Sequence, residues 1–245
     1  MVHQSFSMLS ATIVIPFHNE KKNLEILSNE LLNALENKPK DIDVSVIFVN
    51  DNSDDGGDVY ISKFINKLEN FKIINLEKRS GQTGAFKKAF NQCKTDYIIR
   101  MDSDLQDNPK DLNLFFNKII LLQPHLIMGI REVRKHRRVL RLASIIYDFL
   151  MVLLFNSPLR SSSGSFVCFK KEFVENLPWY KNDHRYLPLI TINRGAHKII
   201  EVIVIHRERS FGNSKYSAFN KLFFGIFEVL IFSLRMKLGL YKIKQ

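Results

Sequence analysis

The stretch YIIRMDSDLQD, residues 97–107, joins a short strand pattern to a pair of acids. Its first three residues are aromatic or β-branched, which favours a buried strand. Asp102 and Asp104 follow where that strand would end, and Asn108 and Pro109 then supply a cap and a first position for a helix. A strand, an acidic turn and a helix in this order place two carboxylates at a crevice rather than in the core.

Two carboxylates at this spacing suit a divalent cation. Hard cations such as Mg²⁺ take carboxylate oxygens together with the oxygens of a bound phosphate. The alternative is an acidic loop that only caps the following helix, and it accounts for Asp107 and Asn108. It leaves Asp102 and Asp104 without a role. Spacing alone keeps both interpretations open.

Similar units surround the acidic motif in the first half of the chain. Apolar runs predict further strands, and segments with apolar residues at helical spacing separate them. This alternation predicts an α/β fold with a mostly parallel sheet covered by helices on both faces. The expected strands, besides the one at 97–99, are 11–16, 44–49, 72–76 and 126–130, with helices at 24–35, 59–68, 86–93 and 112–122.

Polar residues gather after the ends of these strands. In parallel sheets, ligands bind beyond the carboxyl ends of the strands. The convergence therefore predicts one ligand site built by loops from several strands. The segments expected there are Pro16 to Glu20, Asp51, Gly81 to Gly84, Asp102 to Gln106, and Arg131.

Composition points to anionic partners. The 245 residues include 36 Lys and Arg against 25 Asp and Glu, for a net charge of +11. Such a surface favours nucleic acid, an acidic membrane leaflet or phosphorylated ligands. Cys93 and Cys168 lack metal or redox spacing, so we expect two small core residues and a reducing compartment.

The alternating pattern ends near residue 131. Six basic residues crowd into 131–141, followed by an apolar segment at 142–155, and a second apolar segment at 222–234 precedes a basic C-terminus. Neither segment reaches the roughly 18 apolar residues of a spanning helix, so both fit amphipathic helices that lie on a membrane. The N-terminus lacks the pattern of a secretory signal.

Taken together, the motifs resemble those of the family 2 glycosyltransferases, in the branch of dolichol-phosphate mannose synthases and bacterial polyprenyl-phosphate glycosyltransferases. Each motif alone is weak, but the set is specific and runs in the expected order from about residue 11 to about residue 220. The matching segments are IPFHNE at 15–20, VNDNS at 49–53, MDSDLQ at 101–106, HRYLP at 184–188 and HRERSFGNSKY at 206–216.

This resemblance implies a GT-A fold, which is Rossmann-like, a nucleotide-sugar donor and a divalent metal, Mg²⁺ or Mn²⁺. It also implies a GT-A catalytic domain at 1–205 and a C-terminal loop with an amphipathic membrane-associated helix at 206–245. It assigns the metal to Asp102, Asp104 and Gln106. The donor-binding residues that it implies are Pro16, His18, Glu20, Asp51, Asp102, Ser103, Asp104, Arg131, Arg209 and Lys215.

For the acceptor phosphate, the resemblance implies Arg131 and Arg137, and for catalysis Asp104, Arg209 and Lys215. The chain also departs from the family pattern. His18 stands where Tyr is usual, Asn50 replaces the first acid of an Asp-Asp pair, and Leu159-Arg160 occupies a place where many relatives have Asp. These departures concern nucleoside stacking, a secondary position and local acceptor contacts.

The predicted reaction is inverting transfer of a hexose from a GDP- or UDP-sugar to undecaprenyl or dolichyl phosphate, as part of cell-envelope glycan synthesis. The enzyme would lie at the cytoplasmic face of the membrane, without a spanning helix. A phosphate monoester has its second pKa at about 6, so this acceptor is already ionised and needs no general base. The donor nucleotide, the sugar, the lipid length and the oligomeric state stay open.

Two alternatives remain at this stage. A hydroxyl acceptor on a glycan or glycolipid would need a base, with Asp104 or Asp107 as candidates. A basic module that binds nucleic acid or anionic membranes would use the net charge alone. The acids at the strand ends argue against such a module and against nucleic acid as a partner.

Overall fold

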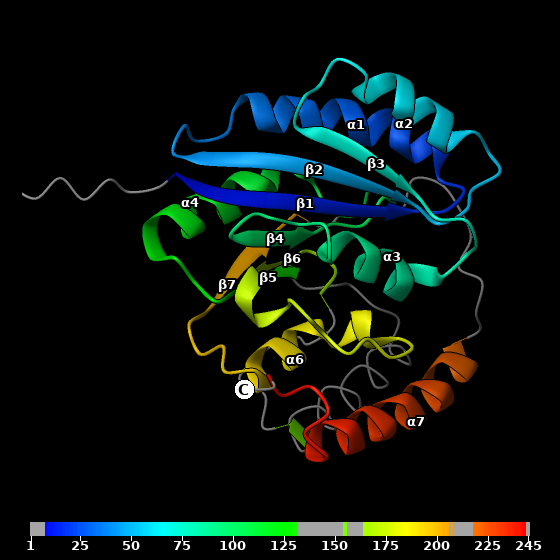
Figure 1. The fold of residues 1–245 in the computed structure, drawn as a ribbon, viewed down its shortest axis with the longest axis vertical. Coiled ribbons are helices and arrows are strands. Elements are labelled where there is room, and N and C mark those ends of the chain that lie inside the picture. The colour runs from blue at the N-terminus through cyan, green and yellow to red at the C-terminus, as the bar shows by residue number, and fades with distance from the viewer. Residues whose placement is uncertain (1–7, 132–153, 156–163, 206, 208–217, 244–245) are drawn as a thin grey trace, which may run out of the picture.

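A mixed seven-stranded sheet forms the centre of the protein in a computed structural model that describes residues 8–131, 154–155, 164–205, 207 and 218–243 (Figure 1). The strands are β1 (Leu9–Phe17), β2 (Ile42–Asn50), β3 (Phe71–Asn75), β4 (Tyr97–Arg100), β5 (Leu126–Arg131), β6 (Val167–Lys170) and β7 (Ile199–Val204). Their order across the sheet is β3-β2-β1-β4-β6-β5-β7.

All strands except β6 run in the same direction. Strands β3, β2, β1 and β4 pair in parallel, as do β5 and β7, whereas β6 pairs antiparallel with both β4 and β5. The prediction of a mostly parallel sheet is therefore confirmed. Six parallel strands bring six carboxyl ends to one edge, which is where the acidic motif follows β4.

Helices cover both faces of this sheet. The described helices are α1 (Lys21–Glu36), α2 (Gly57–Ile65), α3 (Gly81–Phe90), α4 (Leu112–Leu122), α6 (Leu187–Asn193) and α7 (Ala218–Lys237), with short 3-10 turns η1 (Pro109–Asp111), η2 (Lys171–Phe173) and η3 (Asp183–Arg185). Figure 1 shows α1 and α2 on one side of the sheet and α3, α6 and α7 on the other, with α7 farthest from it.

Alternation along β1 explains the two layers. Ile13 and Ile15 pack into a core shared with α1, α2 and α4, whereas Val14 packs into a core shared with α3, α6 and α7. Successive side chains of a strand point to opposite faces, so a continuous apolar run is what a doubly covered strand requires. The apolar runs of the sequence predict these buried strands correctly.

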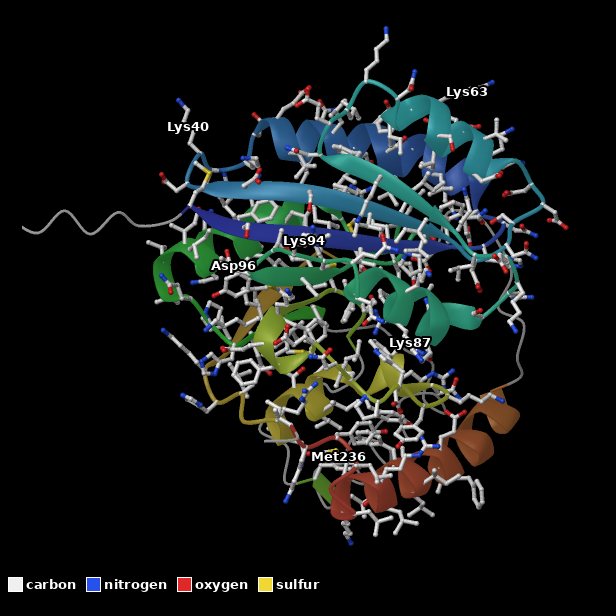
Figure 2. The ribbon with its side chains drawn as sticks, in the orientation of Figure 1. Lys40, Lys63, Lys87, Lys94, Asp96 and Met236 are labelled. Carbon is white, nitrogen blue, oxygen red and sulfur yellow. The ribbon has the colours of Figure 1, made fainter. Side chains whose placement is uncertain are left out.

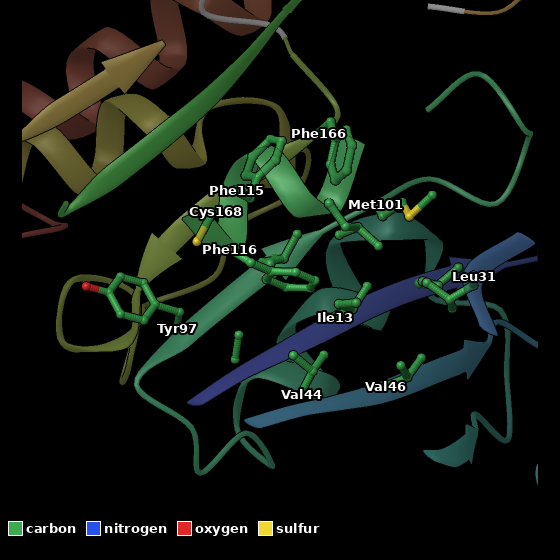
Figure 3. Packing of buried hydrophobic residues seen from close by; sticks show 14 of the residues in the cluster. Ile13, Leu31, Val44, Val46, Tyr97, Met101, Phe115, Phe116, Phe166 and Cys168 are labelled. Atoms are coloured by element: carbon green, nitrogen blue, oxygen red, sulfur yellow. The ribbon is translucent and has the colours of Figure 1, made fainter. Parts of the chain in front are cut away.

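The first core reaches the base of the acidic motif. Figure 3 shows Phe115 and Phe116 of α4 in one cluster with Ile13 and Met101, and all four side chains are fully buried. The rings of Phe115 and Phe166 stack with centroids 4.5 Å apart. Met101, the first residue of the motif, is therefore part of the core, whereas Asp102 and Asp104 lie outside it.

Several predicted boundaries shift. The glycine-bearing segment 81–84, expected as a loop, forms the first turn of α3. The helix expected to start at Pro109 begins as the 3-10 turn η1 and becomes α-helical only at Leu112. Asn108 caps it as predicted, because its side chain accepts a hydrogen bond from the Lys110 N–H at 3.2 Å. Of the apolar segment 142–155, only 154–155 lie among the described residues.

Helix α7 has one face on the protein and one exposed apolar face. Phe232 stacks on Tyr186 with ring centroids 4.2 Å apart, and Met236 is partly buried against the second core (Figure 2). Side chains on the other side of α7 project away from the protein. Among the described helices, none has the length and apolar content needed to cross a membrane.

Candidate active site

The acidic motif leaves β4 as a tight loop pinned from below. The Met101 N–H donates to the Val14 carbonyl at 3.2 Å, which continues the sheet pairing by one residue. Leu105 adopts a left-handed backbone with φ of 64° and is only 2% exposed. A bulky residue in this conformation is strained by on the order of 1–3 kcal/mol, which the burial of its side chain offsets. Leu105 thus fastens the loop between Asp104 and Gln106.

Asp107 closes the same loop. One of its carboxylate oxygens accepts the Asp102 N–H at 3.2 Å, and the other accepts the Ser165 hydroxyl at 3.0 Å. The residue is 2% exposed. Asp107 therefore has the surroundings of a buried structural carboxylate, which weakens its candidacy as a base for a hydroxyl acceptor.

The two motif carboxylates are oriented by different neighbours. Oδ1 of Asp102 lies 3.7 Å from the Arg100 guanidinium and 3.4 Å from the Gln82 amide nitrogen. Oδ1 of Asp104 accepts the Gln106 N–H at 3.2 Å, which brings the backbone of Gln106 against this acid. Ser103, between the two acids, is 6% exposed. Asp102, Asp104 and Gln106 therefore form one small polar cluster.

This donor set fits a cation that binds together with a phosphate ligand. Within the described ranges, no three His, Cys, Asp or Glu side chains converge as an all-protein metal site. Mg²⁺ rarely uses such a site, because it takes one or two carboxylates and completes its shell with substrate phosphates and water. Asp102 and Asp104, with the amide oxygen of Gln106, have that chemistry.

Asp51 ties the end of β2 to the start of α3. Its two carboxylate oxygens accept the Ser80 N–H at 2.6 Å and the Gly81 N–H at 2.9 Å. Gly81 has a φ of 69°, a conformation that favours glycine at this turn. An ionised carboxylate has about four acceptor positions, so these bonds use two of them. The expected nucleoside contact of Asp51 thus belongs to a side chain that also caps α3.

Loops from β1 and β2 meet beside Asp51. The His18 ring donates from Nδ1 to the Asp51 carbonyl at 2.9 Å. Asn19 and Asp54 exchange two hydrogen bonds of 2.7 and 3.0 Å. Glu20 accepts from the Asn23 amide nitrogen. The predicted set at this end of the sheet therefore includes two half-exposed side chains, His18 and Glu20, next to one that is buried, Pro16.

Arg207, shortly after β7, contacts the acidic motif. The Arg207 N–H donates to the Gln106 carbonyl at 3.1 Å, and the Arg207 guanidinium donates to Asn108 at 2.7 Å. The same guanidinium pairs with both oxygens of Glu30 at 2.7 and 2.9 Å. Arg207 is the second residue of the HRERSFGNSKY motif, so one residue of this motif contacts the segment at 102–106.

Other predicted residues are not described. Arg137, Arg209 and Lys215 lie outside the described residues, as does the side chain of Arg131. The backbone of Arg131 ends β5, where it pairs with Val204 of β7. Strand β5 runs parallel to β4, so its carboxyl end lies at the same edge of the sheet as the motif.

Sequence analysis missed the partners of Asp102. Arg100, 6% exposed, donates to the His184 carbonyl at 2.6 Å. The His184 ring shares a hydrogen bond of 2.7 Å with the Thr83 hydroxyl. Burial, aided by the charges of Arg100 and Arg185, lowers the pKa of His184 to about 3, so the ring is neutral. A charged residue inside the strand pattern YIIR was the available signal.

Comparison with known proteins places these features in a family. Residues 12–178 match the family model described as "Glycosyl transferase family 2". The undecaprenyl-phosphate 4-deoxy-4-formamido-L-arabinose transferase of Photorhabdus laumondii is 29% identical over 225 residues, covering 89% of this chain and 66% of the relative. That of Yersinia enterocolitica is 28% identical over 221 residues, covering 87% and 64%. The chain thus spans just under two thirds of the length of these relatives.

Solved structures share the fold. Glucosyl-3-phosphoglycerate synthase from Mycobacterium tuberculosis, in complex with phosphoglyceric acid, aligns with a TM-score of 0.71 at 15% identity over 92% of this chain and 80% of that one. Mannosyltransferase PcManGT from Pyrobaculum calidifontis, in complex with GDP-Man and Mn²⁺, aligns with a TM-score of 0.60 at 17% identity, covering 86% and 60%. The GT-A fold predicted from the motifs is confirmed.

Proposed function

Since the chain belongs to glycosyl transferase family 2, we propose that it transfers a hexose from a nucleotide sugar to a polyprenyl phosphate at a membrane surface. One observation carries this proposal. The carboxylates of the motif at 102–106 lie at the sheet edge where the loops after β1 and β2 also meet. The sequence relatives support the acceptor, because both are named as undecaprenyl-phosphate transferases.

On the donor side, the proposal assigns binding of the diphosphate to the acid cluster. Asp102, Asp104 and Gln106 would hold Mg²⁺ or Mn²⁺, which neutralises charge on a departing nucleoside diphosphate when bound. Two of the structurally similar proteins support a divalent ion. PcManGT was solved with GDP-Man and Mn²⁺, and glucosyl-3-phosphoglycerate synthase was solved with UDP-glucose and Mn²⁺. Both nucleotides are therefore tested below.

The nucleoside would lie over the loops after β1 and β2. The proposal assigns it to Pro16, His18, Glu20 and Asp51, with Ser103 next to the diphosphate. His18 is held by its Nδ1 bond to the Asp51 carbonyl, which leaves Nε2 for a bond to the nucleoside. Because hydrogen bonds already hold the side chains of His18 and Asp51 in place, binding of a base or ribose would not have to order them.

The acceptor half of the proposal requires no general base. A phosphate monoester is ionised near neutral pH, and the burial of Asp107 with both oxygens bonded fits the same chemistry. Catalysis would then rest on positioning and on charge stabilisation. The proposal assigns the charges to Arg131 and Arg137 for the acceptor and to Arg209 and Lys215 for the diphosphate.

Helix α7 supports peripheral membrane association. Phe227, Leu230, Ile231 and Leu234 recur at helical spacing and are 39–64% exposed. Lys237 and Lys242 are exposed at the same end of the chain. An apolar stripe beside lysines suits insertion at the headgroup level of an anionic leaflet. We extend the proposal to the cytoplasmic face, with the catalytic domain at 1–205 and the membrane-associated part at 206–245.

A donor screen tests the proposed function. The full chain is incubated with Mn²⁺, each of several UDP- and GDP-hexoses, and vesicles that contain undecaprenyl or dolichyl phosphate. One donor should give a lipid-phosphate sugar product that disappears when EDTA is added. Sugar transfer to a glycan hydroxyl in place of the lipid phosphate, or no transfer with any donor, would overturn the proposal.

A further inference from the structure

Arg100 is a buried arginine at the end of β4, directly before the acidic motif. Its side chain is 7% exposed. The guanidinium carbon lies 4.9 Å above the centre of the Phe86 ring. One terminal nitrogen donates to the His184 carbonyl at 2.6 Å, and the other lies 3.7 Å from Oδ1 of Asp102. A buried charge is costly unless it is paired, so this position needs a reason beyond packing.

The contacts of Asp102 are one-sided. Arg100 and Gln82 both meet Oδ1. The described part of the chain supplies no such partner to Oδ2, which remains available to a ligand. Both contacts thus restrain the carboxylate through the same oxygen, Oδ1.

The residues on both sides of His184, whose carbonyl accepts from Arg100, make contacts of their own. Asp183, next to His184, accepts the Tyr180 N–H at 2.7 Å and the Tyr241 hydroxyl at 2.8 Å. On the other side of His184, Arg185 pairs with Glu228 of α7 at 2.8 Å. The segment around the His184 carbonyl is thus held mainly by the buried Asp183, whereas the Arg185 pair is exposed and contributes little.

The side chain between the His184 carbonyl and the motif donates a hydrogen bond on one side and brings a positive charge within 3.7 Å of a carboxylate on the other. A guanidinium presents its donors in a rigid planar fork, whereas an ammonium is a compact point charge. Arg100 uses one arm of the fork for the carbonyl and turns the other toward the carboxylate. The Nε–H finds no acceptor among the described residues, so the two terminal nitrogens carry the contacts.

We infer that Arg100 is a positioning residue, which fixes Asp102 through Oδ1 and so directs Oδ2 toward the cation on the donor diphosphate. The inference rests on the proposed function, because it gives Asp102 a cation to bind. The opposite role is a competing counter-charge that weakens cation binding. The two roles predict changes of opposite sign when the guanidinium is removed.

Manganese binding tests this assignment without measuring turnover. The Kd of Mn²⁺ is measured by electron paramagnetic resonance in the presence of saturating UDP or GDP, and the nucleotide Kd is measured separately without metal. Loss of a residue that orients a metal ligand costs about 10- to 100-fold in metal affinity. We expect Arg100→Gln to raise the Mn²⁺ Kd by this amount, Arg100→Lys to restore it only in part, and metal-free nucleotide binding to stay unchanged.

Arg185→Gln is the matched control. It removes the same charge one residue from His184, but its partner is Glu228 and its side chain is 53% exposed. An exposed ion pair contributes little, so the Mn²⁺ Kd should change by less than about threefold. Thermal unfolding identifies variants that fail to fold. If Arg100→Gln fails to fold, the Mn²⁺ Kd of Arg100→Lys, which keeps the charge, tests the role of Arg100 instead.

Three results would overturn the inference. A folded Arg100 variant could bind Mn²⁺ as tightly as the wild type or more tightly, or it could lose metal-free nucleotide affinity to the same extent as metal affinity. Either result rejects the role of Arg100 and leaves the proposed function standing. If the wild type binds neither nucleotide with Mn²⁺, the proposed function and this inference fail together.

Discussion

Two regions of the protein hold charged side chains, and they differ in the partners of those side chains. One region is the set of loops at the carboxyl ends of β1, β2 and β4, and the other is the segment around η3. In the strand-end loops, carboxylates accept backbone N–H groups close to the turns they stabilise, as Asp51 does at Ser80 and Gly81. Around η3, charged side chains reach across the fold, as Asp183 does to Tyr241 and Arg235.

The two regions therefore have different roles in our proposal: the strand-end loops bind the donor, and the η3 segment stabilises the fold. The strand-end loops carry the acids that we assign to the donor, and they follow directly from the sheet. The η3 segment carries no proposed ligand contact, yet it holds Arg100 and packs against α7. Substitutions in the first region should therefore change activity more than stability, and substitutions in the second region should do the reverse.

The largest effect is expected from Asp104→Asn. Loss of a metal-binding carboxylate should lower kcat/KM by about 10³-fold or more, equivalent to about 4 kcal/mol of transition-state stabilisation. The midpoint of urea unfolding should stay close to that of the wild type, because Asp104 lies in a loop outside the two cores. Steady-state kinetics and urea titration measure both quantities.

The control is Asp43→Asn, an exposed acid near the start of β2 and far along the strand from the ligand edge. This variant should keep both activity and stability. If the Asp104 variant turned over at the wild-type rate at saturating donor, the proposed role of the strand-end loops in the reaction would be wrong.

Phe232→Ala tests the supporting region. Phe232 is 1% exposed and stacks on Tyr186. Replacing a buried Phe by Ala costs about 3–5 kcal/mol. We expect this loss in the urea unfolding of the part that contains α7, together with faster proteolysis within 218–243. Asp104 and its loop should be spared, so Mn²⁺ binding with nucleotide should survive. Equal loss of metal binding would mean that the two regions are not separable.

A pH experiment examines the same region through His184. The folded protein holds the pKa of this imidazole at about 3, far below its ordinary value of 6.5. A lowered pKa means that the unfolded chain binds the proton first. Stability is therefore full above pH 6.5 and falls as the pH drops toward 3, by about 1.4 kcal/mol per pH unit.

Between pH 7 and pH 5, the wild type should lose about 2 kcal/mol more unfolding free energy than His184→Gln, which has no proton to gain in this range. Urea titrations at the two pH values measure the difference. Burial raises the pKa of Asp183, whose effect has the opposite sign, but it is common to both proteins and cancels. Identical pH dependence in the two proteins would contradict a buried neutral His184.

The smallest effect concerns the exposed face of α7 and the turn that follows it. Replacing Leu234 and Leu238, 58% and 65% exposed, by Ser should lower partitioning onto anionic vesicles about tenfold, since each removes apolar area from the interface. The matched control replaces Leu121 and Leu122, 74% and 41% exposed on α4. Cosedimentation compares them. An equal loss of vesicle binding in the two double variants would contradict membrane association through α7.

The same comparison explains what the sequence could predict. Apolar runs and strand ends are local patterns, so the sheet, its two helical layers and the position of the acid cluster were predictable. The cap at Asn108 is local as well, because its partner is the N–H of Lys110. The Asp51 carboxylate, by contrast, accepts from Ser80, 29 positions away. The hydrogen bond from Arg100 to His184 spans 84 positions, and no local pattern encodes a contact of that kind.

Strand β6 illustrates a second limit. It pairs antiparallel with both β4 and β5, and no local pattern sets its direction or its place between strands that lie far away along the chain. The HRYLP motif likewise marked 184–188 without revealing that a backbone carbonyl, which any residue type provides, is what contacts the motif arginine.

The most direct test is a crystal structure of the full chain soaked with Mn²⁺ and its nucleotide-sugar donor, with the ion located by anomalous scattering. We expect one strong peak between the donor diphosphate and the carboxylates of Asp102 and Asp104, with Oδ2 of Asp102 facing the ion. A manganese peak elsewhere on the protein, or a bound donor with both carboxylates turned away from its diphosphate, would contradict the assignment of this edge as the active site.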